Sequence, residues 1–241
     1  MQAASARAHH SASVPGLLEE PQDLSSWREF RAQLVNVELA DRGPFCGRNP
    51  DATGSWCHRI ADAETGCLLL ANTPGMGFFE RAVVLIVEHS SSRSLGLVLN
   101  RQAGVQIQDL AIEDSVAQVL GACPLRLGGP HLLSHLHLLH GDRRVTDATL
   151  LCPGLYTGGL QSALKLAAAG QCQVSDFCLA AGYTGWQDGQ LQSEIRQGSW
   201  IPVSVDPKKV LEIACCGVGG PSAWHDLFSM VSEPDRVYIE R

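Results

Sequence analysis

Residues 182–200 read GYTGWQDGQLQSEIRQGSW, and no other stretch of the chain departs as far from average composition. Glycine permits close backbone approach or a positive φ, and tryptophan brings a large apolar body with one N–H donor that needs a partner. Their dense mixture predicts a tight turn packed under aromatic rings and followed by a short helix.

Within that helix, Leu191 and Ile195 are four residues apart and share one face, while Gln190 and Glu194 share the adjacent face. Two interpretations stay open at this point. The stretch is either a packed turn–helix corner, or a place where a polar Gln190–Glu194 pair points into a cleft beside Trp186.

Apolar runs on both sides of this stretch predict the remaining elements. Further strands are expected at 66–71, 82–88, 94–100, 125–127, 136–139, 177–181 and 200–205, with one more within 145–156. Helices are expected at 23–41, 159–169, 207–211 and 222–231, with a helical patch near 105–120. Strands dominate the early part without regular βαβ alternation, which favours a mixed α+β domain over a doubly wound sheet.

Four ordered blocks carry a family resemblance: GYTGWQDGQLQSEI from residue 182, GCLLLA at 66–71 with FERAVVL at 79–85, GLVLNR at 96–101, and GGP at 128–130 followed by Leu139-His140. Together they resemble the AlgH/YqgE family (UPF0301, DUF179) over about residues 64–230. The segment WREFRA at 27–32 resembles the N-terminal extension of its plant and green-algal branch. The resemblance implies a mixed, partly barrel-like sheet flanked by helices. It implies no activity, because the family has none established.

These observations divide the chain into a transit-peptide-like or disordered segment at 1–22, a helix and linker at 23–63, the AlgH/YqgE-like domain at 64–231, and a tail at 232–241. Residues 1–18 contain no acid and one arginine among many alanines and serines. This composition is typical of an organellar transit peptide and favours the chloroplast stroma, with the cytoplasm as the alternative.

The overall composition limits the possible partners. The formal net charge of −7 disfavours direct nucleic-acid binding, which requires a basic surface. No apolar run approaches eighteen residues, so we expect no transmembrane helix. Nine cysteines without paired C-x-x-C units indicate mostly buried, reduced thiols.

Two motifs suggest ligand chemistry but match no complete pattern. His131, His135, His137 and His140, with Asp142 nearby, could hold zinc, but at no recognised spacing, and we expect no metal. Gly128-Gly129-Pro130 lacks the lysine and serine or threonine of a phosphate loop. It indicates a strand that turns sharply, and we expect no cofactor.

Asn100-Arg101 ends a predicted buried strand and could recognise an anion, or could simply cap the sheet and pair with a surface acid. The sequence contains no recognised nucleophile motif. The sequence therefore favours a non-catalytic interaction or regulatory protein that acts by contact with another protein. The resemblance points to regulation as well, because relatives are described as candidate transcriptional regulators. The alternative is an enzyme or small-ligand binder, whose cleft would draw on Asn100, Arg101, Gly128, Gly129, Trp186, Gln190 and Glu194.

Overall fold

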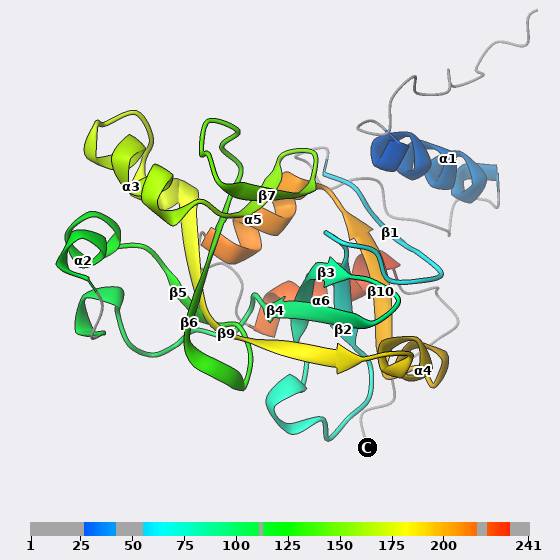
Figure 1. Cartoon of the computed structure of the whole chain (residues 1–241). Helices are drawn as coiled ribbons and strands as arrows, with labels where there is room; N and C mark the ends of the chain where they lie inside the picture. The colour runs from blue at the N-terminus through cyan, green and yellow to red at the C-terminus, as the bar shows by residue number, and fades with distance from the viewer. Residues whose placement is uncertain (1–26, 42–54, 111–112, 216–220, 232–241) are drawn as a thin grey trace, which may run out of the picture.

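The computed structural model describes residues 27–41, 55–110, 113–215 and 221–231 (Figure 1). Three predicted segments lie wholly or partly outside these residues. They are the transit-peptide-like segment at 1–22, the tail at 232–241, and residues 42–54 of the predicted linker.

A single mixed sheet organises the described chain. Its strands follow the order β1-β10-β2-β3-β4-β9-β6-β8-β7, and β5 pairs with β9 beside this path. The strands are β1 (Cys57–Arg59), β2 (Leu68–Ala71), β3 (Val83–His89), β4 (Arg93–Val98), β5 (Leu125–Leu127), β6 (His131–His140), β7 (Ala148–Cys152), β8 (Leu155–Gly158), β9 (Phe177–Gln187) and β10 (Trp200–Val205). All described pairs are antiparallel except β5 with β9, and β1 and β7 form the two ends.

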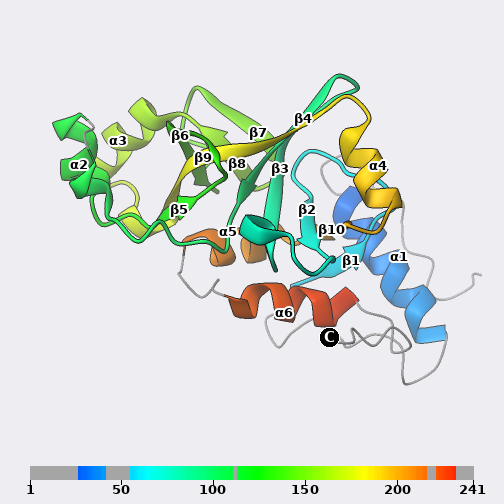
Figure 2. The ribbon, with the colours of Figure 1, turned by 90° about the horizontal axis from the view of Figure 1, so that it is seen from below.

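Six α-helices surround the sheet. They are α1 (Trp27–Asp41), α2 (Asp114–Leu120), α3 (Leu160–Ala168), α4 (Gln190–Arg196), α5 (Pro207–Cys215) and α6 (Pro221–Val231) in the described ranges. The helices α2 and α3 lie at one end of the molecule and α4 at the other (Figures 1 and 2). Three short 3₁₀ turns complete the elements, at Gly77–Phe79, Ile107–Asp109 and Val174–Asp176.

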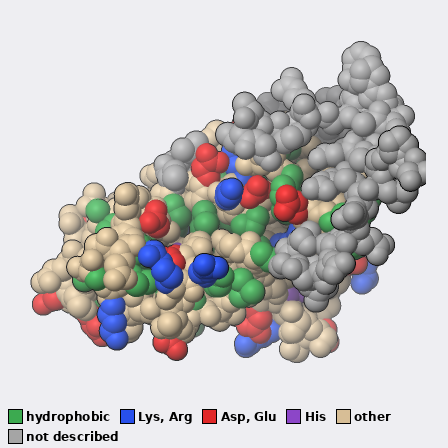
Figure 3. All heavy atoms as spheres, turned by 90° about the horizontal axis from the view of Figure 1, so that it is seen from above, with side chains coloured by type: hydrophobic (Ala, Val, Ile, Leu, Met, Phe, Trp, Pro, Cys, Tyr) green, Lys and Arg blue, Asp and Glu red, His purple; other side chains and the backbone are tan. Residues whose placement is uncertain are grey.

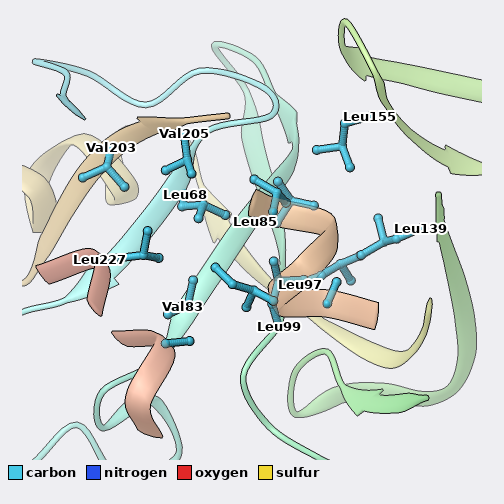
Figure 4. Close-up of a cluster of buried hydrophobic side chains, with 14 of the residues drawn as sticks. Leu68, Val83, Leu85, Leu97, Leu99, Leu139, Leu155, Val203, Val205 and Leu227 are labelled. Carbon is cyan, nitrogen blue, oxygen red and sulfur yellow. The ribbon is translucent and has the colours of Figure 1, made fainter. Parts of the chain in front are cut away.

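The continuous apolar runs form strands that are buried on both faces. Alternate residues of β2 and β3, such as Leu68 and Leu85, pack towards α5 and α6 (Figure 4). Their neighbours, such as Leu69 and Val84, pack on the other side with Trp186 and Trp200. Because side chains of a strand alternate between faces, a run without polar residues requires cover on both sides.

The strand β9 is the longest in the described sheet and runs across the molecule from the α2–α3 end to α4 (Figure 1). Its first half pairs with β5 and β6, and its second half pairs with β4. The change of neighbours occurs around Gly182, between Ala181, the last residue that pairs with β5, and Thr184, the first that pairs with β4. Gly182 has a φ of +73°. A β-carbon on Gly182 would lie 2.6 Å from the carbonyl oxygen of Gly129 and 2.7 Å from that of His131.

The tight turn and short helix predicted within the glycine–tryptophan stretch are confirmed at Asp188-Gly189 and α4. The predicted end of the preceding strand at residue 181 is wrong. Residues Gly182 to Gln187 continue β9, and the turn comes only at Asp188-Gly189, before α4. Dense glycine suggests chain reversal, whereas at Gly182 it permits close passage of backbones. The buried positions predicted for the two tryptophans are confirmed, because Trp186 is 5% and Trp200 3% exposed.

The predicted α+β class is confirmed, but the sheet of the described residues is not closed into a barrel. The sheet also begins before residue 64, because β1 pairs with β10. The helix α1 contacts this edge: Arg28 donates to the Thr65 carbonyl at 2.6 Å, and Arg31 pairs with Glu64 at 2.8 Å.

Three histidines are held in environments that disfavour their charged form. Burial lowers the pKa of His58, His137 and His140 below the ordinary histidine value. The ring of His140 is fully buried, stacks on Tyr156 with centroids 5.6 Å apart, and meets Phe177 edge-on. As the pH falls through the ordinary histidine pKa, these histidines become protonated in the unfolded chain but stay neutral in the folded chain. Protonation therefore stabilises the unfolded state relative to the folded state.

We therefore predict that the free energy of unfolding, measured by urea denaturation, is lower at pH 5 than at pH 7.5. A phenylalanine can occupy the apolar stack without titrating, so His140→Phe should weaken this pH dependence. The exposed His131 serves as control, and His131→Gln should leave the dependence as in the native chain. An unchanged pH dependence in His140→Phe would show that His140 does not contribute.

Candidate functional site

The glycine–tryptophan stretch folds into a hydrogen-bonded clasp around one carboxylate. Oε2 of Glu194 accepts the indole N–H of Trp186 at 2.9 Å and that of Trp200 at 2.8 Å. Its Oε1 accepts the side-chain amide of Gln190 at 2.9 Å. The two indole rings meet edge-to-face with centroids 5.8 Å apart. We call Glu194, Trp186, Trp200 and Gln190 the tryptophan clasp.

The clasp explains why α4 starts and lies where it does. Gly189 has a φ of +68° and reverses the chain directly before the helix. The backbone N–H of Gln187 donates to the side-chain oxygen of Gln190, and Leu191 is fully buried in the same apolar cluster as the two rings. Both carboxylate oxygens of Glu194 thus accept bonds from residues of the same clasp. The arrangement fixes β9, α4 and β10 to one another.

Asn100 and Arg101 bind the neighbouring loop through backbone groups. The Asn100 side-chain oxygen accepts the N–H of Val83 at 2.9 Å, and its amide donates to the Arg81 carbonyl at 2.8 Å. The guanidinium of Arg101 donates to the carbonyl of Glu80. Two roles were expected for this pair: recognition of an anion, or a cap of the sheet by Asn100 with an ion pair from Arg101 to a surface acid. Neither role fits fully, because Asn100 bridges two segments and Arg101 donates to a backbone carbonyl.

These residues nevertheless face a cavity of about 500 Å³, which is lined by Gly77, Glu80, Arg81, Asn100 and Arg101. The carboxylate of Glu80 accepts the backbone N–H groups of Gly75 at 2.8 Å and Met76 at 3.3 Å. The lining therefore contains two arginines and one carboxylate already bound to backbone.

Gly128 and Gly129 are engaged in backbone packing. Gly128 accepts from the N–H of Val98 and donates to the carbonyl of Ala181, each at 2.8 Å. A β-carbon on Gly129 would lie 2.1 Å from the backbone of Tyr183. The pair thus joins β4 to β9, as a sharply constrained segment does, and its amides are not arranged as a phosphate loop.

The predicted site residues consequently occupy three separate places. Asn100 and Arg101 share one cavity, whose lining does not include the tryptophan clasp or the two glycines. Trp186, Gln190 and Glu194 form the clasp, and Gly128 with Gly129 lies at the crossing with β9. Their role in binding a ligand or partner stays a prediction.

The four histidines lie along β6, and the rings of His135 and His137 are in contact, with centroids 4.9 Å apart. His131 and His135 are exposed, His137 is half-buried and His140 is fully buried. In the described ranges, no three His, Cys, Asp or Glu side chains gather as a set of metal ligands. The carboxylate considered to complete a zinc site, Asp142, instead binds the guanidinium of Arg144 at 2.6 Å.

The buried cysteines are poor nucleophiles. Desolvation raises the pKa of Cys67, Cys123 and Cys178 to about 12 in each case. Because the thiolate is the reactive form, these three thiols stay neutral and unreactive at physiological pH.

Sequence reasoning misses two features of the surface and the interior. Leu132 and Leu133 lie at 62% and 56% exposure on a bulge of β6, although apolar residues between histidines are typical of a half-buried strand. Arg126 is the opposite case, a charged side chain that is only 1% exposed. The signal that could have found it is a charged residue in the centre of the short run Leu125–Leu127.

Comparison with known proteins agrees with this architecture. The chain belongs to the AlgH-like family (DUF179), whose sequence model matches residues 68–233, more than half of the chain. It is 38% identical over 141 residues to a UPF0301 protein of Chlamydia caviae, covering 57% of this chain and 73% of that protein. It is 36% identical over 141 residues to one from Chlorobium phaeobacteroides, with the same coverage of 57% and 73%.

Solved structures show the same fold. A crystal structure from Corynebacterium diphtheriae matches with a TM-score of 0.58 and 26% identity, covering 73% of this chain and 91% of that one. The solution structure of the AlgH protein from Pseudomonas aeruginosa matches with a TM-score of 0.53 over 71% of this chain and 92% of that one. The latter likeness, at 22% identity, concerns the fold alone.

The clasp predicts a graded effect of substitutions at Glu194. Glu194→Ala leaves two buried indole N–H groups without an acceptor and should lower the free energy of unfolding by about 2–4 kcal/mol. Glu194→Gln keeps one acceptor oxygen and should cost less. Glu212→Ala, which removes an exposed partner of Lys209 at i−3, is the control and should cost at most about 0.5 kcal/mol. Urea denaturation checks the order, and equal costs for the two alanine variants would refute the clasp.

Proposed function

We propose that this protein is a non-catalytic interaction protein that binds another protein through the bulge of β6. Two observations support a binding role over catalysis. The polar residues that were candidates for chemistry, Asn100 and Glu194, hold backbone and indole groups of the protein itself. The thiols of Cys67, Cys123 and Cys178 have a raised pKa.

The geometry of the bulge carries the proposal. His131 pairs with Tyr183 of β9 and Leu136 with Ala181, so residues 132–135 lie opposite the single residue Gly182. These four residues leave the sheet and place Leu132 and Leu133 in solvent. We call residues 132–135 the β6 bulge.

Leu132 combines two unfavourable features. Its φ is +46°, a left-handed conformation that is a genuine outlier for a bulky side chain, and its apolar side chain is 62% exposed. Strain that persists at an exposed position points to a role that the isolated chain does not reveal. Insertion of the two leucines into a partner's apolar pocket would remove their surface from water and offset that cost.

The charge of the chain indicates which partner fits. With a formal net charge of −7, a second copy of this chain would be repelled at long range, whereas a different protein with a less acidic surface would not. On the face drawn in Figure 3, acidic and basic side chains are interspersed rather than gathered by sign. Among the helices that the structure describes, none combines the length and apolar character needed to cross a bilayer. The occupant we propose is a different protein with an apolar pocket.

A second candidate function is the binding of a small anionic molecule. The observation that favours it is the cavity lined by Arg81, Asn100 and Arg101, in which two permanent cations accompany one carboxylate. The cleft expected from the sequence also included Trp186 and Glu194, but both lie in the tryptophan clasp. A small anionic ligand would therefore bind in the cavity lined by Asn100 and the two arginines, without contact to the tryptophan clasp.

Substitutions in the bulge separate binding from folding. Leu132→Asn combined with Leu133→Ser removes both apolar side chains, and asparagine tolerates the left-handed conformation better than leucine. We predict that this variant unfolds at the same or a higher urea concentration than the native chain but loses its protein partner. Leu150→Ser on β7, where Leu150 is 54% exposed, is the matched control and should retain the partner.

Partners are identified by quantitative affinity capture from the native compartment and then purified for titration against each variant. The proposal requires at least a tenfold rise in Kd for the bulge variant and none for Leu150→Ser. It is refuted when the bulge variant binds every purified partner as the native chain does. It is equally refuted when sedimentation shows that the bulge serves only self-association.

A further inference from the structure

A buried arginine lies beside a cavity of about 1010 Å³. Arg126 occupies the centre of β5 and is 1% exposed. Its Nε donates to the carbonyl of Ala214 at 2.9 Å, and its Nη2 donates to that of Ile213 at 3.4 Å. Both acceptors lie in the last turn of α5, whose C-terminal end carries a partial negative charge.

This helix end compensates only part of the guanidinium charge. The aligned peptide dipoles of a helix amount to roughly half an elementary charge at its terminus. Within the described ranges no carboxylate forms an ion pair with Arg126, whereas Arg28, Arg31, Arg93 and Arg144 each pair with one. The third nitrogen, Nη1, takes part in neither carbonyl bond. Arg126 is thus a buried cation with incomplete compensation, which is costly unless a further anion is present.

The neighbouring thiols do not supply that anion. Cys123 lines the same cavity, and Cys178 is close enough to Arg126 for the guanidinium to act on its thiol. Desolvation raises the pKa of both thiols to about 12, and Cys178 reaches this value although the nearby positive charge of Arg126 lowers it. Both thiols are therefore neutral at physiological pH.

The cavity has the size and lining of a small-molecule site. Its volume lies at the upper end of ordinary ligand pockets. Besides Arg126, the polar side chains of its lining are Gln102, Gln106, Gln108 and Asp109. The carboxylate of Asp109 already accepts the backbone N–H of Gln106 at 3.2 Å. The lining thus offers one cation, neutral amides that can donate or accept, and one carboxylate that is already engaged.

We propose that this cavity binds a small organic oxyanion, a carboxylate or a phosphate ester, through Arg126. Two of the three guanidinium nitrogens are occupied by α5, so Nη1 would contact one anionic oxygen. The glutamine amides would bind the polar body of the ligand. Such a ligand would complete the charge balance of Arg126 and link β5 to the end of α5.

The site is tested with two defined probes, citrate and inorganic phosphate, titrated separately into the full-length protein and followed by ¹H–¹⁵N NMR. We expect saturable shift changes at Gln102, Gln108 and Arg126 for at least one probe at concentrations up to about 20 mM. A response to citrate alone assigns a carboxylate ligand, and a response to phosphate alone assigns a phosphate ligand.

Two variants locate the binding. Gln108 is exposed, so Gln108→Ala should keep the fold. It should raise the apparent Kd at least threefold for the probe that binds the native protein. Arg126→Met replaces the buried cation by an apolar chain of similar length and should raise the apparent Kd at least tenfold, with folding checked by the same spectra. Arg144→Gln, which alters an exposed ion pair, is the control and should leave the Kd unchanged.

The proposal is overturned when neither probe produces saturable shifts in the native protein. It is also overturned when binding survives both Gln108→Ala and Arg126→Met, because the anion then binds elsewhere. If Arg126→Met does not fold, Gln108→Ala alone decides between these outcomes. None of these results depends on the β6 bulge or its protein partner.

Discussion

The close passage of two backbones at Gly182 is the constraint on which the described fold depends. Around this residue β9 changes partners, from β5 and β6 before it to β4 from Thr184 onward, so one continuous strand connects the two halves of the sheet. Gly128 and Gly129 lie directly against this point, where a β-carbon would come within 2.4 Å and 2.1 Å of the backbone of β9. Only hydrogen fits in place of a side chain there, since real β-carbons do not approach other atoms so closely. The glycines of the family motifs therefore maintain the architecture, and the β6 bulge lies opposite Gly182 at the crossing.

The polar motif residues Asn100 and Glu194 are hydrogen-bonded to groups of the protein itself on either side of this crossing. Beyond the crossing, β9 ends in Trp186, whose buried indole needs an acceptor that the apolar interior lacks. Glu194 supplies it and satisfies Trp200 as well. On the neighbouring strand, Asn100 follows the end of β4 and hydrogen-bonds to Val83 at the start of β3 and to Arg81 just before it. Groups that resemble a binding site in sequence thus maintain the fold. The features on which we propose recognition to rest are the strained, exposed Leu132 and the buried, incompletely compensated Arg126.

The sequence predicted the parts of the fold that depend on local pattern. Apolar runs placed β2, β3, β5 and β10. Glycine was ambiguous, because a turn and a backbone crossing both require it, and only the pairing partners of β9 distinguish them. The two proposed binding surfaces could not be predicted, since burial of Arg126 and exposure of Leu132 depend on how distant strands pack. Both residues contradict their ordinary preference, and a pattern built on preference cannot identify them.

The central claim is that Gly182 is required for close approach and not only for its positive φ. Gly189 provides the matched comparison, because its φ of +68° is close to the +73° of Gly182, while a β-carbon placed on Gly189 would meet no atom within 4 Å. The direct measurement is the free energy of unfolding in urea for Gly182→Ala and Gly189→Ala. We predict a loss of about 1–2 kcal/mol for Gly189→Ala, the cost of a left-handed L-residue, and at least twice that loss or failure to fold for Gly182→Ala. Equal losses for the two variants would contradict the claim.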